Sequence, residues 1–265
     1  MTNILVSNDD GINAPGLFYL KQALDDVGEV TVIAPDREWT ASGHAKTMHK
    51  PLRINEVALP DGSLAYVSNG SPADCIHLAV LGFLSNRPDL VVSGINLGAN
   101  VGHDITYSGT VAAAIEGTIS GIPSLAASLD TYEDGDFRYA ARFVAYLAQE
   151  VLAHGLPRNV LLNVNVPSVL GKEIAGVEIT RLGRRLYRDE LIERQDPRGQ
   201  PYYWIGGERP CGFAEDEGTD IWALARKCIS ITPIHLDMTD YKLVEELRSW
   251  NITAVSAGDR TEATK

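Results

Sequence analysis

Hydrophobic residues in the first two-thirds of the chain alternate between short β-branched runs and stretches with the spacing of an amphipathic helix. The runs predict strands at residues 4–6, 30–33, 90–92, 124–129 and 160–166. The helical spacing predicts helices at residues 17–27, 110–119 and 137–153, the last of them ended by Gly155. A further helix is predicted to start at Ser71-Pro72-Ala73-Asp74. Strands and helices that alternate in this order predict an α/β fold with a doubly wound parallel sheet. In such sheets, binding sites lie beyond the carboxyl ends of the strands.

The pattern changes after about residue 171. Residues 174–180 still have the pattern of a strand, but residues 181–227 are rich in Arg, Gly, Pro and aromatic residues without a helical period. An irregular stretch of this length is unusual inside a compact domain, so we predict an arm over about 171–228 that packs on another subunit. A strand at 229–235, a helix at about 240–250 capped by Thr239 and a disordered tail at 259–265 are expected to follow. We expect one domain over residues 1–265, with a core of about 1–170 plus 229–252.

Composition and charge narrow the classes of function. The formal net charge of −12 argues against general binding to nucleic acid, which needs a basic face, but not against a small anion bound through a cation. The cysteines Cys75, Cys211 and Cys228 have no zinc-binding spacing. The first residues lack a basic segment, and no apolar run reaches the roughly 20 residues that span a membrane. We therefore expect a cytoplasmic protein without membrane contacts.

Two adjacent acids follow the first predicted strand, in Ser7-Asn8-Asp9-Asp10-Gly11. Within a strand their side chains would point to opposite faces, but at a strand end that runs into a turn both can face one point. Carboxylates so close repel each other unless a cation lies between them, and oxygen ligands suit Mg²⁺, Mn²⁺ or Ca²⁺. The alternative is a loop in which one Asp caps the next helix and the other is solvated. These five residues alone favour neither reading.

Three further loops follow predicted strands and should reach the same edge of the sheet. Ser93-Gly94-Ile95-Asn96-Leu97-Gly98 combines glycines with an Asn amide, which offers a neutral donor and acceptor. Tyr107-Ser108-Gly109-Thr110-Val111 opens a helix, where N–H groups and hydroxyls can bind a phosphate or simply cap the helix. Residues 35–44 add hydroxyls, a cation and a histidine. Each loop alone is a weak signal, but the convergence of four loops favours a site.

Two more ionisable residues are candidates for chemistry. Asp104 lies just before the Tyr107 segment, and His235 ends the strand predicted at 229–235. An isolated histidine is more often structural, although its usual pKa of about 6.5 would suit protonation of a leaving oxygen. The cluster Arg181, Arg184, Arg185 and Arg188 could hold a phosphorylated substrate, but its place in the arm favours a solvated or intersubunit face.

Taken together, these motifs resemble the SurE (survival protein E) family of metal-dependent 5′/3′-nucleotidases. The matching segments, in family order along nearly the whole chain, are Ser7-Asn8-Asp9-Asp10-Gly11, Ala34-Pro35-Asp36-Arg37, Gly70-Ser71-Pro72-Ala73-Asp74-Cys75, Val92-Ser93-Gly94-Ile95-Asn96-Leu97-Gly98, Tyr107-Ser108-Gly109-Thr110-Val111, Asn163-Val164-Asn165-Val166-Pro167 and Ile231-Thr232-Pro233-Ile234-His235. The resemblance implies a Rossmann-like core and a β-rich C-terminal arm exchanged between subunits of a homodimer or homotetramer. It also implies hydrolysis of nucleoside 5′- and 3′-monophosphates.

The same resemblance implies the ligands of one divalent cation per subunit, Mg²⁺ or Mn²⁺ being the best suited. Asp9, Asp10 and Asn96 occupy the positions of three family ligands. The fourth family ligand is a serine, which aligns without a gap with Thr40. Threonine keeps the hydroxyl, so we choose Thr40 and retain Ser42 as the alternative.

The implied reaction is hydrolysis of a phosphomonoester to an alcohol and phosphate. On this hypothesis, Asp9 and Asp10 act through the cation, Asp104 orients the attacking water and His235 protonates the leaving oxygen. The residues expected to hold the phosphoryl group are Asn96, Gly98, Ser108, Gly109 and Thr110. A phosphatase that forms an aspartyl-phosphate is disfavoured, because its signature is Asp-x-Asp and the acids Asp9 and Asp10 are adjacent. A non-catalytic metal- and nucleotide-binding stress sensor is the alternative from another class.

Overall fold

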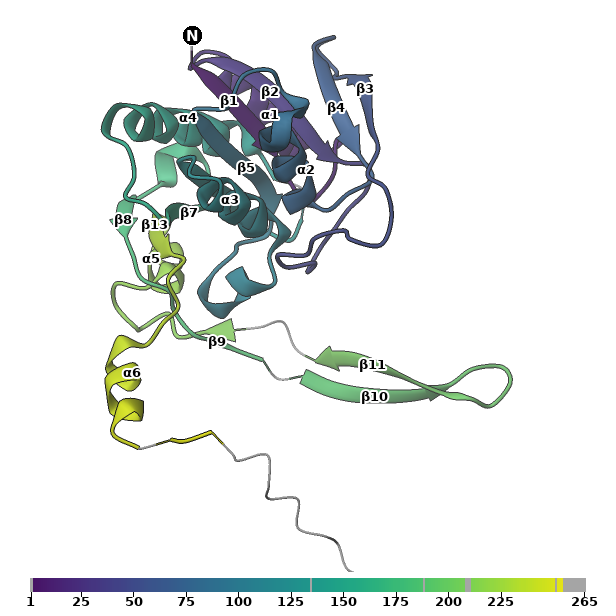
Figure 1. The fold of residues 1–265 in the computed structure, drawn as a ribbon, viewed down its shortest axis with the longest axis vertical. Helices are drawn as coiled ribbons and strands as arrows, with labels where there is room; N and C mark the ends of the chain where they lie inside the picture. Colours follow the sequence, from purple (N-terminus) through teal and green to yellow (C-terminus); the bar gives the residue numbers. More distant parts are fainter. Residues whose placement is uncertain (1, 134, 188, 208–210, 251, 255–265) are drawn as a thin grey trace, which may run out of the picture. The chain divides into compact units, whose positions relative to one another are not determined.

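The protein is described here by a computed structural model that covers residues 2–133, 135–187, 189–207, 211–250 and 252–254. The chain divides into two compact units, Met1–His235 and Leu236–Lys265. A nine-stranded sheet in the order β3-β4-β2-β1-β5-β6-β7-β13-β8 forms the centre of the first unit (Figure 1). Its strands are β1 (Asn3–Ser7), β2 (Glu29–Pro35), β3 (Ile54–Ala58), β4 (Leu64–Ser68), β5 (Leu90–Leu97), β6 (Ser124–Asp130), β7 (Val160–Pro167), β8 (Gly176–Ile179) and β13 (Cys228–His235).

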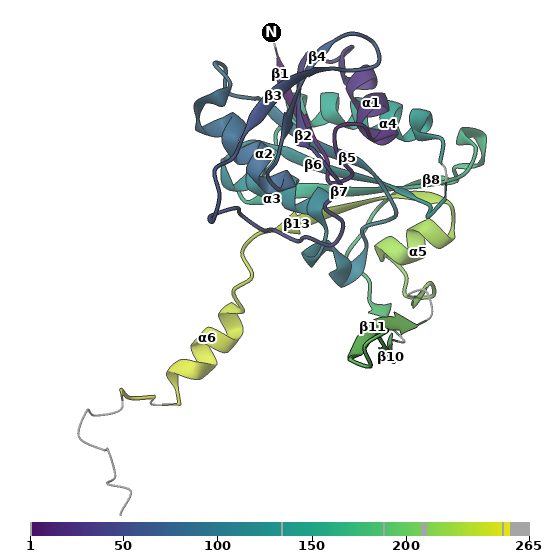
Figure 2. The ribbon, with the colours of Figure 1, turned by 90° about the vertical axis from the view of Figure 1, so that its right-hand side faces the viewer.

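Helices cover both faces of this sheet, as the alternation of strands and helices predicts (Figure 2). Side chains of β1 alternate between the faces: Ile4 and Val6 belong to one core and Leu5 to the other. The core around Ile4 contains α1 (Pro15–Leu24) and α4 (Phe137–His154), and the core around Leu5 contains α2 (Pro72–Leu78) and α3 (Gly109–Ile119). A central strand buried on both faces explains the unbroken apolar run that marks β1 in the sequence. The predicted α/β class is confirmed.

The helix ends follow local sequence signals. Ser71 forms a capping box with Asp74: the Ser71 hydroxyl accepts from the Asp74 N–H at 3.1 Å, and the Asp74 carboxylate accepts from the Ser71 N–H at 2.8 Å. A π-helical turn, η1 (Ala79–Phe83), continues α2. Gly155, with a φ of 73°, ends α4. These starts and stops agree with the sequence prediction because they depend only on neighbouring residues.

The structure corrects the sequence prediction in three places. The edge hairpin β3–β4 was not predicted, because β3 is too exposed to show a clear apolar period, although the turn signal Pro60-Asp61-Gly62 lies within it. Strand β13 lies where a strand was expected but runs antiparallel to β7. The final helix, α6 (Tyr241–Arg248), is capped by Asp240, whose side chain accepts from the Leu243 N–H at 3.0 Å, and not by Thr239.

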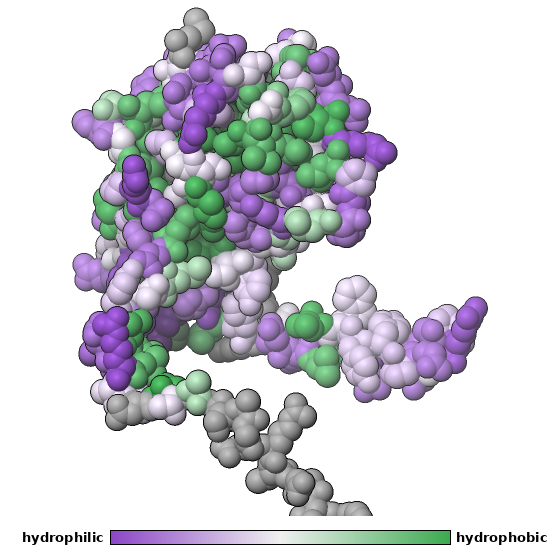
Figure 3. Space-filling view, in the orientation of Figure 1, coloured by the Kyte–Doolittle hydropathy of each residue, from purple (hydrophilic) through white to green (hydrophobic). Residues whose placement is uncertain are grey.

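The predicted arm contains more regular structure than its sequence suggests. Its elements are β9 (Arg185–Leu186), β10 (Asp189–Gln195), β11 (Pro201–Gly207), β12 (Cys211–Gly212) and the short helix α5 (Asp220–Ala225). Strands β10 and β11 pair with each other in a two-stranded sheet of their own. The hairpin exposes apolar residues near its root and aromatic residues beyond them (Figure 3). These exposed residues are Leu191, Ile192, Tyr202, Tyr203, Trp204 and Ile205.

The second unit contains α6, in which no residue is buried. The tail predicted at 259–265 lies outside the described residues. Within the part of the chain that the structure describes, no helix combines the length and the apolar character needed to cross a membrane.

Candidate active site at the carboxyl edge of the sheet

The four loops singled out in the sequence meet at one edge of the sheet. Strand β1 has β2 on one side and β5 on the other, and all three strands are parallel. The chain therefore leaves β1 and β5 in opposite directions, which opens a crevice between their carboxyl ends. A cavity of about 730 Å³ lies there. The residues that line it are Asp9, Asp10, Glu38, Thr40, Ala41, Asn96, Leu97, Asn100, Asp104, Tyr107, Ser108, Tyr132, Tyr187 and Asp189.

Asp9 is held in place by the start of α3. The Asp9 side chain accepts a hydrogen bond from the hydroxyl of Thr110, and the residue is only 5% exposed. Gly109 permits this approach, since a Cβ at that position would lie 2.6 Å from the Cβ of Asp9. Thr110 is fully buried behind Asp9 and does not line the cavity, whereas the sequence prediction placed it on the phosphate. Gly109 does not line the cavity either, and its lack of a side chain leaves room for Asp9.

The two acids of the first loop lie side by side, Asp9 buried and Asp10 half-buried, and each is hard to ionise there. Burial raises the pKa of Asp9, against the effect of hydrogen bonding by Thr110. Burial and the neighbouring charge of Asp9 raise the pKa of Asp10 to about 7, although a backbone hydrogen bond from Leu97 opposes the rise. A cation between the two carboxylates would offset both the lost hydration and the mutual repulsion. The donor set therefore fits a divalent metal ion.

Two neutral side chains face the same cavity. The Asn96 amide nitrogen donates to the carbonyl of Gly98 at 2.7 Å, which leaves the amide oxygen as the atom available to a ligand. The hydroxyl of Thr40 donates to Glu38, so its oxygen keeps lone pairs for a ligand. Ser42 does not line the cavity, and its hydroxyl is buried without a partner among the described residues. Gly98 shapes the turn after β5, with a φ of 111°, and is also outside the cavity lining.

Asp104 is bound by residues from the root of the arm, which is the segment that holds Gly183, Arg185 and Tyr187. Its carboxylate forms an ion pair with Arg185 at 2.8 Å and accepts a hydrogen bond from the hydroxyl of Tyr187. The Arg185 guanidinium also donates to the Tyr132 hydroxyl at 3.2 Å. Burial and the bond to Asp104 raise the pKa of Tyr187 to about 12, so its hydroxyl stays a donor. The arm thus supplies part of the cavity wall, although the sequence prediction left Arg185 on a solvated or intersubunit face.

A buried carboxylate joins the root of the arm to the loop that carries Asp104. The side chain of Asp220, at the start of α5, accepts from the Gly102 N–H at 2.7 Å and from the Gly183 N–H at 2.8 Å. A Cβ at Gly102 would lie 2.8 Å from the Gly183 carbonyl oxygen, so the two backbones are in direct contact. The position of Arg185 relative to Asp104 is therefore fixed by buried hydrogen bonds and not only by their own ion pair.

The structure does not bring His235 to this cavity. His235 pairs with Val160 in the antiparallel ladder between β13 and β7, and Val160 is the first residue of β7. The cavity lies beyond the opposite ends of the parallel strands, roughly 20 Å away along a strand of this length. The sequence prediction failed here because it could not know the direction of β13. A role for His235 as the proton donor within its own chain is not supported by this placement.

The loop that carries Thr40 is fastened to the rest of the site at several points. The Trp39 N–H donates to the Asp9 carbonyl at 2.8 Å, and the Gly43 N–H donates to the Tyr107 carbonyl at 2.8 Å. Further along this loop, His44 and Lys46 contact the carboxylate of Glu116 on α3, at 2.8 and 3.0 Å. His77 of α2 contacts the same carboxylate at 2.8 Å. Glu116 is 1% exposed and thus anchors three segments at a buried point.

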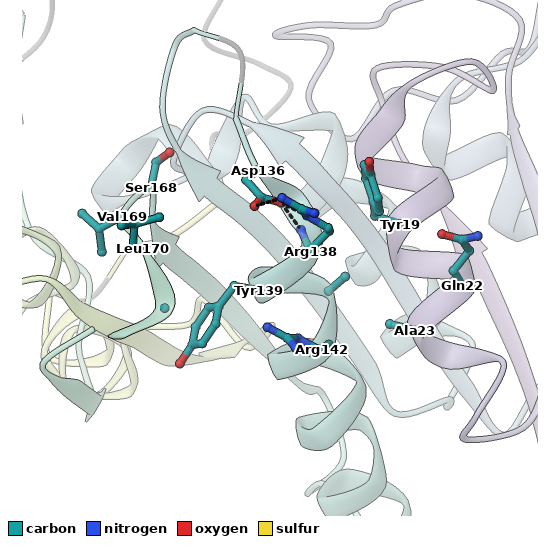
Figure 4. Close-up of a pocket in the computed structure, with 12 residues that line it drawn as sticks. Tyr19, Gln22, Ala23, Asp136, Arg138, Tyr139, Arg142, Ser168, Val169 and Leu170 are labelled. Atoms are coloured by element: carbon teal, nitrogen blue, oxygen red, sulfur yellow. Dashed lines mark hydrogen bonds and ion pairs between the residues drawn. The ribbon is translucent and has the colours of Figure 1, made fainter. Parts of the chain in front are cut away.

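A second cavity, of about 770 Å³, lies between α1 and α4 and contains none of the predicted site residues (Figure 4). Its lining includes Tyr19, Tyr139, Arg138 and Arg142. Arg138 is already bound by both oxygens of Asp136, at 2.8 and 2.7 Å. The carboxylate pair and the loops expected from the sequence therefore single out the cavity at the strand ends.

No group of three or more His, Cys, Asp or Glu side chains is arranged to hold a metal ion among the described residues. The predicted ligand set is of a different kind, since only Asp9 and Asp10 are of those types and the other two ligands are a hydroxyl and an amide. Cys75 and Cys228 are buried free thiols, as expected for cysteines without a metal-binding spacing.

The fold and the site define an α/β protein with an acidic cavity at the switch point of a doubly wound sheet. The family model of survival protein SurE matches residues 4–189, and the chain belongs to this family. It is 54% identical to the 5′-nucleotidase SurE of Herpetosiphon aurantiacus, and the match covers 94% of this chain and 99% of the relative. It is 52% identical to the 5′-nucleotidase SurE of Chloroflexus aggregans, and that match covers 93% of this chain and 98% of the relative. The crystal structure of SurE from Aquifex aeolicus superposes with a TM-score of 0.82 at 41% identity, covering 94% of this chain and all of the other.

Several residues of the site were missed by the sequence prediction. Tyr132 lies two residues beyond the end of β6, so the strand-end rule that found Asp9 could also have found it. Asn100 follows β5 and is held by Ser128, Asn163 and Asn165. Arg185 and Tyr187 lie in the arm, where no periodic pattern marks them. Their contribution depends on a long-range contact with Asp104.

The Glu116 contacts predict a pH-dependent loss of stability in Glu116→Gln. Burial alone would raise the pKa of Glu116, but hydrogen bonds and charge from His44 and Lys46 lower it from 4.5 to about 2. A lowered folded-state pKa means that ionised Glu116 stabilises the protein above about pH 4.5, and that this stability is lost as the pH falls toward 2. We expect Glu116→Gln to lower the free energy of unfolding by about 3 kcal/mol at pH 7, measured by urea denaturation.

The difference between Glu116→Gln and the unaltered protein should shrink steadily below about pH 4.5. The matched control is Glu150→Gln on α4, which removes an exposed contact with His154 at 3.5 Å. Exposed pairs contribute little, so this control should change stability by less than about 1 kcal/mol. Equal effects of the two substitutions, or a Glu116→Gln effect that is the same at pH 3 and pH 7, would contradict the anchoring role.

Proposed function

We propose that the protein is a metal-dependent phosphomonoesterase that hydrolyses nucleoside 5′- and 3′-monophosphates to nucleoside and phosphate. The observation that carries the proposal is the charge of the cavity. Asp9, Asp10, Glu38, Asp104 and Asp189 line it, and its lining among the described residues contains no Lys, Arg or His. A phosphate dianion would be repelled from such a cavity unless a cation neutralised it. The relatives named 5′-nucleotidase SurE support the same reaction for this chain.

We place one divalent cation per subunit, Mg²⁺ or Mn²⁺, between Asp9, Asp10, the Asn96 amide oxygen and the Thr40 hydroxyl. Oxygen donors of this kind suit either ion. When bound, a divalent cation offsets the charge of a phosphoryl oxygen and lowers the pKa of a bound water. The support for this ligand set is that all four residues line one cavity and that the two acids lie side by side, Asp9 buried and Asp10 half-buried.

The surrounding residues position the substrate and the attacking water. Ser108, the cap of α3, lines the cavity, and its hydroxyl accepts from the Val111 N–H at 3.1 Å. We assign this hydroxyl and the positive end of α3 to the phosphoryl oxygens. Asp104 keeps acceptor capacity beyond its contacts with Arg185 and Tyr187, and we assign it the orientation of the water. Gly109 and Thr110 keep Asp9 in place, and Gly98 accepts from the Asn96 amide.

We also propose that the protein works as a cytoplasmic homodimer or homotetramer held together by the arm. An isolated two-stranded hairpin is at best marginally stable in water, and β10–β11 pairs with no other strand described. Ile205 is 80% exposed, and Leu191, opposite it in the ladder, is 71% exposed. Cover by a second copy would remove this apolar surface from water.

Asp10→Asn should abolish turnover and leave the fold intact. The substitution removes half of the paired charge that attracts the cation, so we expect phosphate release from AMP to fall at least about a hundredfold, a loss of several kcal/mol of transition-state stabilisation. EDTA should have the same effect on the unaltered protein, and Mg²⁺ or Mn²⁺ should restore activity. Asp26→Asn, at an exposed acid remote from the cavity, is the control. Absence of EDTA-sensitive release from every nucleoside monophosphate tested would favour the non-catalytic sensor.

A pair of substitutions decides between Thr40 and Ser42 as the fourth ligand. Thr40→Ala should raise the Mn²⁺ concentration that gives half-maximal activity by about tenfold or more, because it removes an oxygen donor. Thr40→Ser keeps the hydroxyl and should stay near the unaltered protein. Ser42→Ala should have little effect, since Ser42 does not line the cavity. The opposite order, with Ser42→Ala the more damaging, would transfer the ligand to Ser42.

Charge placed on the hairpin should separate the subunits. We expect the double variant Leu191→Lys and Ile205→Lys to have the mass of a single chain by light scattering at a concentration where the unaltered protein forms a dimer or tetramer. Leu81→Lys, at an equally exposed leucine on η1, is the matched control and should keep the larger mass. An unaltered protein that is monomeric at tens of micromolar would rule out the assembly.

A further inference from the structure

The cavity between α1 and α4 differs in charge from the cavity at the strand ends (Figure 4). Its charged lining residues are Arg138, Arg142 and Asp136, so two positive charges face one negative charge. The charged residues described in the lining of the strand-end cavity are all acids. In a chain with a net charge of −12, a cavity with an excess of positive charge attracts the anions that the rest of the surface repels.

One of the two arginines is free to bind a ligand. Arg138 is occupied, because its guanidinium donates to both oxygens of Asp136 at 2.8 and 2.7 Å. Arg142 lies one helical turn further along α4, and its exposed side chain forms no hydrogen bond or ion pair with any residue that the structure describes. Hydrogen bonds from Arg138, assisted by the charge of Arg142, lower the pKa of Asp136 to about 2. The acid therefore stays ionised and paired at neutral pH, which leaves Arg142 as the cation available to an anion.

The two arginines are placed where the helix itself does not favour them. Arg138 lies in the first turn of α4, which contains no acid, and Arg142 lies in the next turn. The positive end of the helix dipole opposes positive side chains at this end. The cap residue Asp136 offsets only one of the two charges. An anion bound beside Arg142 would offset the other, and the same helix end would favour its binding.

Two tyrosines give the cavity firm aromatic walls on both helices. The Tyr19 ring of α1 stacks on Phe137, with 6.4 Å between the ring centroids and an angle of 20° between the planes. The Tyr139 ring of α4 lies against Gly171, where a Cβ would be 2.5 Å from the ring. Tyr139 and Arg142 are three residues apart and project from the same side of α4 (Figure 4). A charged group bound at Arg142 would therefore have its organic part beside aromatic surface.

The volume of this cavity, about 770 Å³, suits a small organic molecule better than a lone ion. The planar fork of an arginine binds the oxygens of phosphate, and a phosphate dianion gains more from excess positive charge than a single carboxylate does. We infer that this cavity is a second binding site, for a small organic phosphate whose phosphate group pairs with Arg142 and whose organic part contacts Tyr19 and Tyr139. The site needs no metal ion, because arginine supplies the positive charge. It is independent of the proposed nucleotidase reaction.

Calorimetric titration with AMP in the presence of EDTA tests this site. EDTA removes the cation that would draw phosphate into the strand-end cavity, where the acids repel it. We expect AMP to bind with a Kd below about 1 mM, and inorganic phosphate to bind about tenfold more weakly because it lacks the organic part. Arg142→Ala should weaken AMP binding at least about tenfold, since it removes a charge-assisted hydrogen-bonded pair. Arg158→Ala, at an exposed arginine beyond the other end of α4, is the matched control and should bind AMP as the unaltered protein does.

Asp136→Asn should have the opposite effect. Asparagine caps a helix as well as aspartate does, so α4 keeps its start. The substitution removes the negative charge of the cavity and releases Arg138 from its pair. We therefore expect AMP to bind about threefold tighter or more. A substitution that merely disturbed the fold would weaken binding, so a gain in affinity distinguishes the site from a structural effect.

Absence of AMP binding in EDTA, or equal affinities of Arg142→Ala and the unaltered protein, would overturn the second site. Citrate binding through Arg142 without AMP binding would make the ligand a carboxylate and overturn the assignment to phosphate. Thermal melting shows whether each variant is folded, and Arg142→Gln keeps the comparison valid if Arg142→Ala is not. Absence of EDTA-sensitive turnover by the unaltered protein, by contrast, would overturn the proposed reaction and leave this site in place.

Discussion

Two carboxylates on neighbouring residues lie at the end of a central strand, one buried and one half-buried, and the free energy of removing their charges from water is the constraint on which this site depends. Asp9 is enclosed by the start of α3, and Asp10 lies beside it and accepts a hydrogen bond from the backbone of Leu97 in β5. Each is shifted toward its neutral form, because water is excluded and the second charge is close. An arrangement that is unfavourable in an empty protein becomes favourable around a cation. The fold therefore favours the binding of a cation between these two carboxylates.

Other buried acids hold the loops that complete the cavity. Glu116 gathers His44, Lys46 and His77, and so fixes the loop that carries Thr40 against α2 and α3. Asp220 joins the loop that carries Asp104 to the root of the arm, because it accepts hydrogen bonds from both segments. These two carboxylates face nitrogen donors of other segments, whereas Asp9 and Asp10 lie beside each other. The same residue type thus serves as a structural anchor where donors converge and as a candidate ligand where they do not.

The arm links the site to the surface of the molecule. Its root contributes Arg185, Tyr187 and Asp189 to the cavity region, and its hairpin exposes a set of apolar and aromatic residues. The buried bonds to Asp220 hold the segment around Gly183 against the loop that carries Asp104.

The sequence by itself determined the features that depend on neighbouring residues or on a simple period. It predicted the parallel core, the caps at Ser71 and Gly155 and the strand-end position of Asp9, Asp10 and Asn96, because the carboxyl ends of parallel strands share one edge of a sheet. Only the tertiary structure decided the direction of β13, which removes His235 from the cavity, and the contact that brings Arg185 and Tyr187 to Asp104. Strand direction and long-range pairing leave no periodic trace in a chain. Strand direction and long-range pairing depend on which surfaces pack together in the folded protein. That packing cannot be read from the order of residues in one sequence.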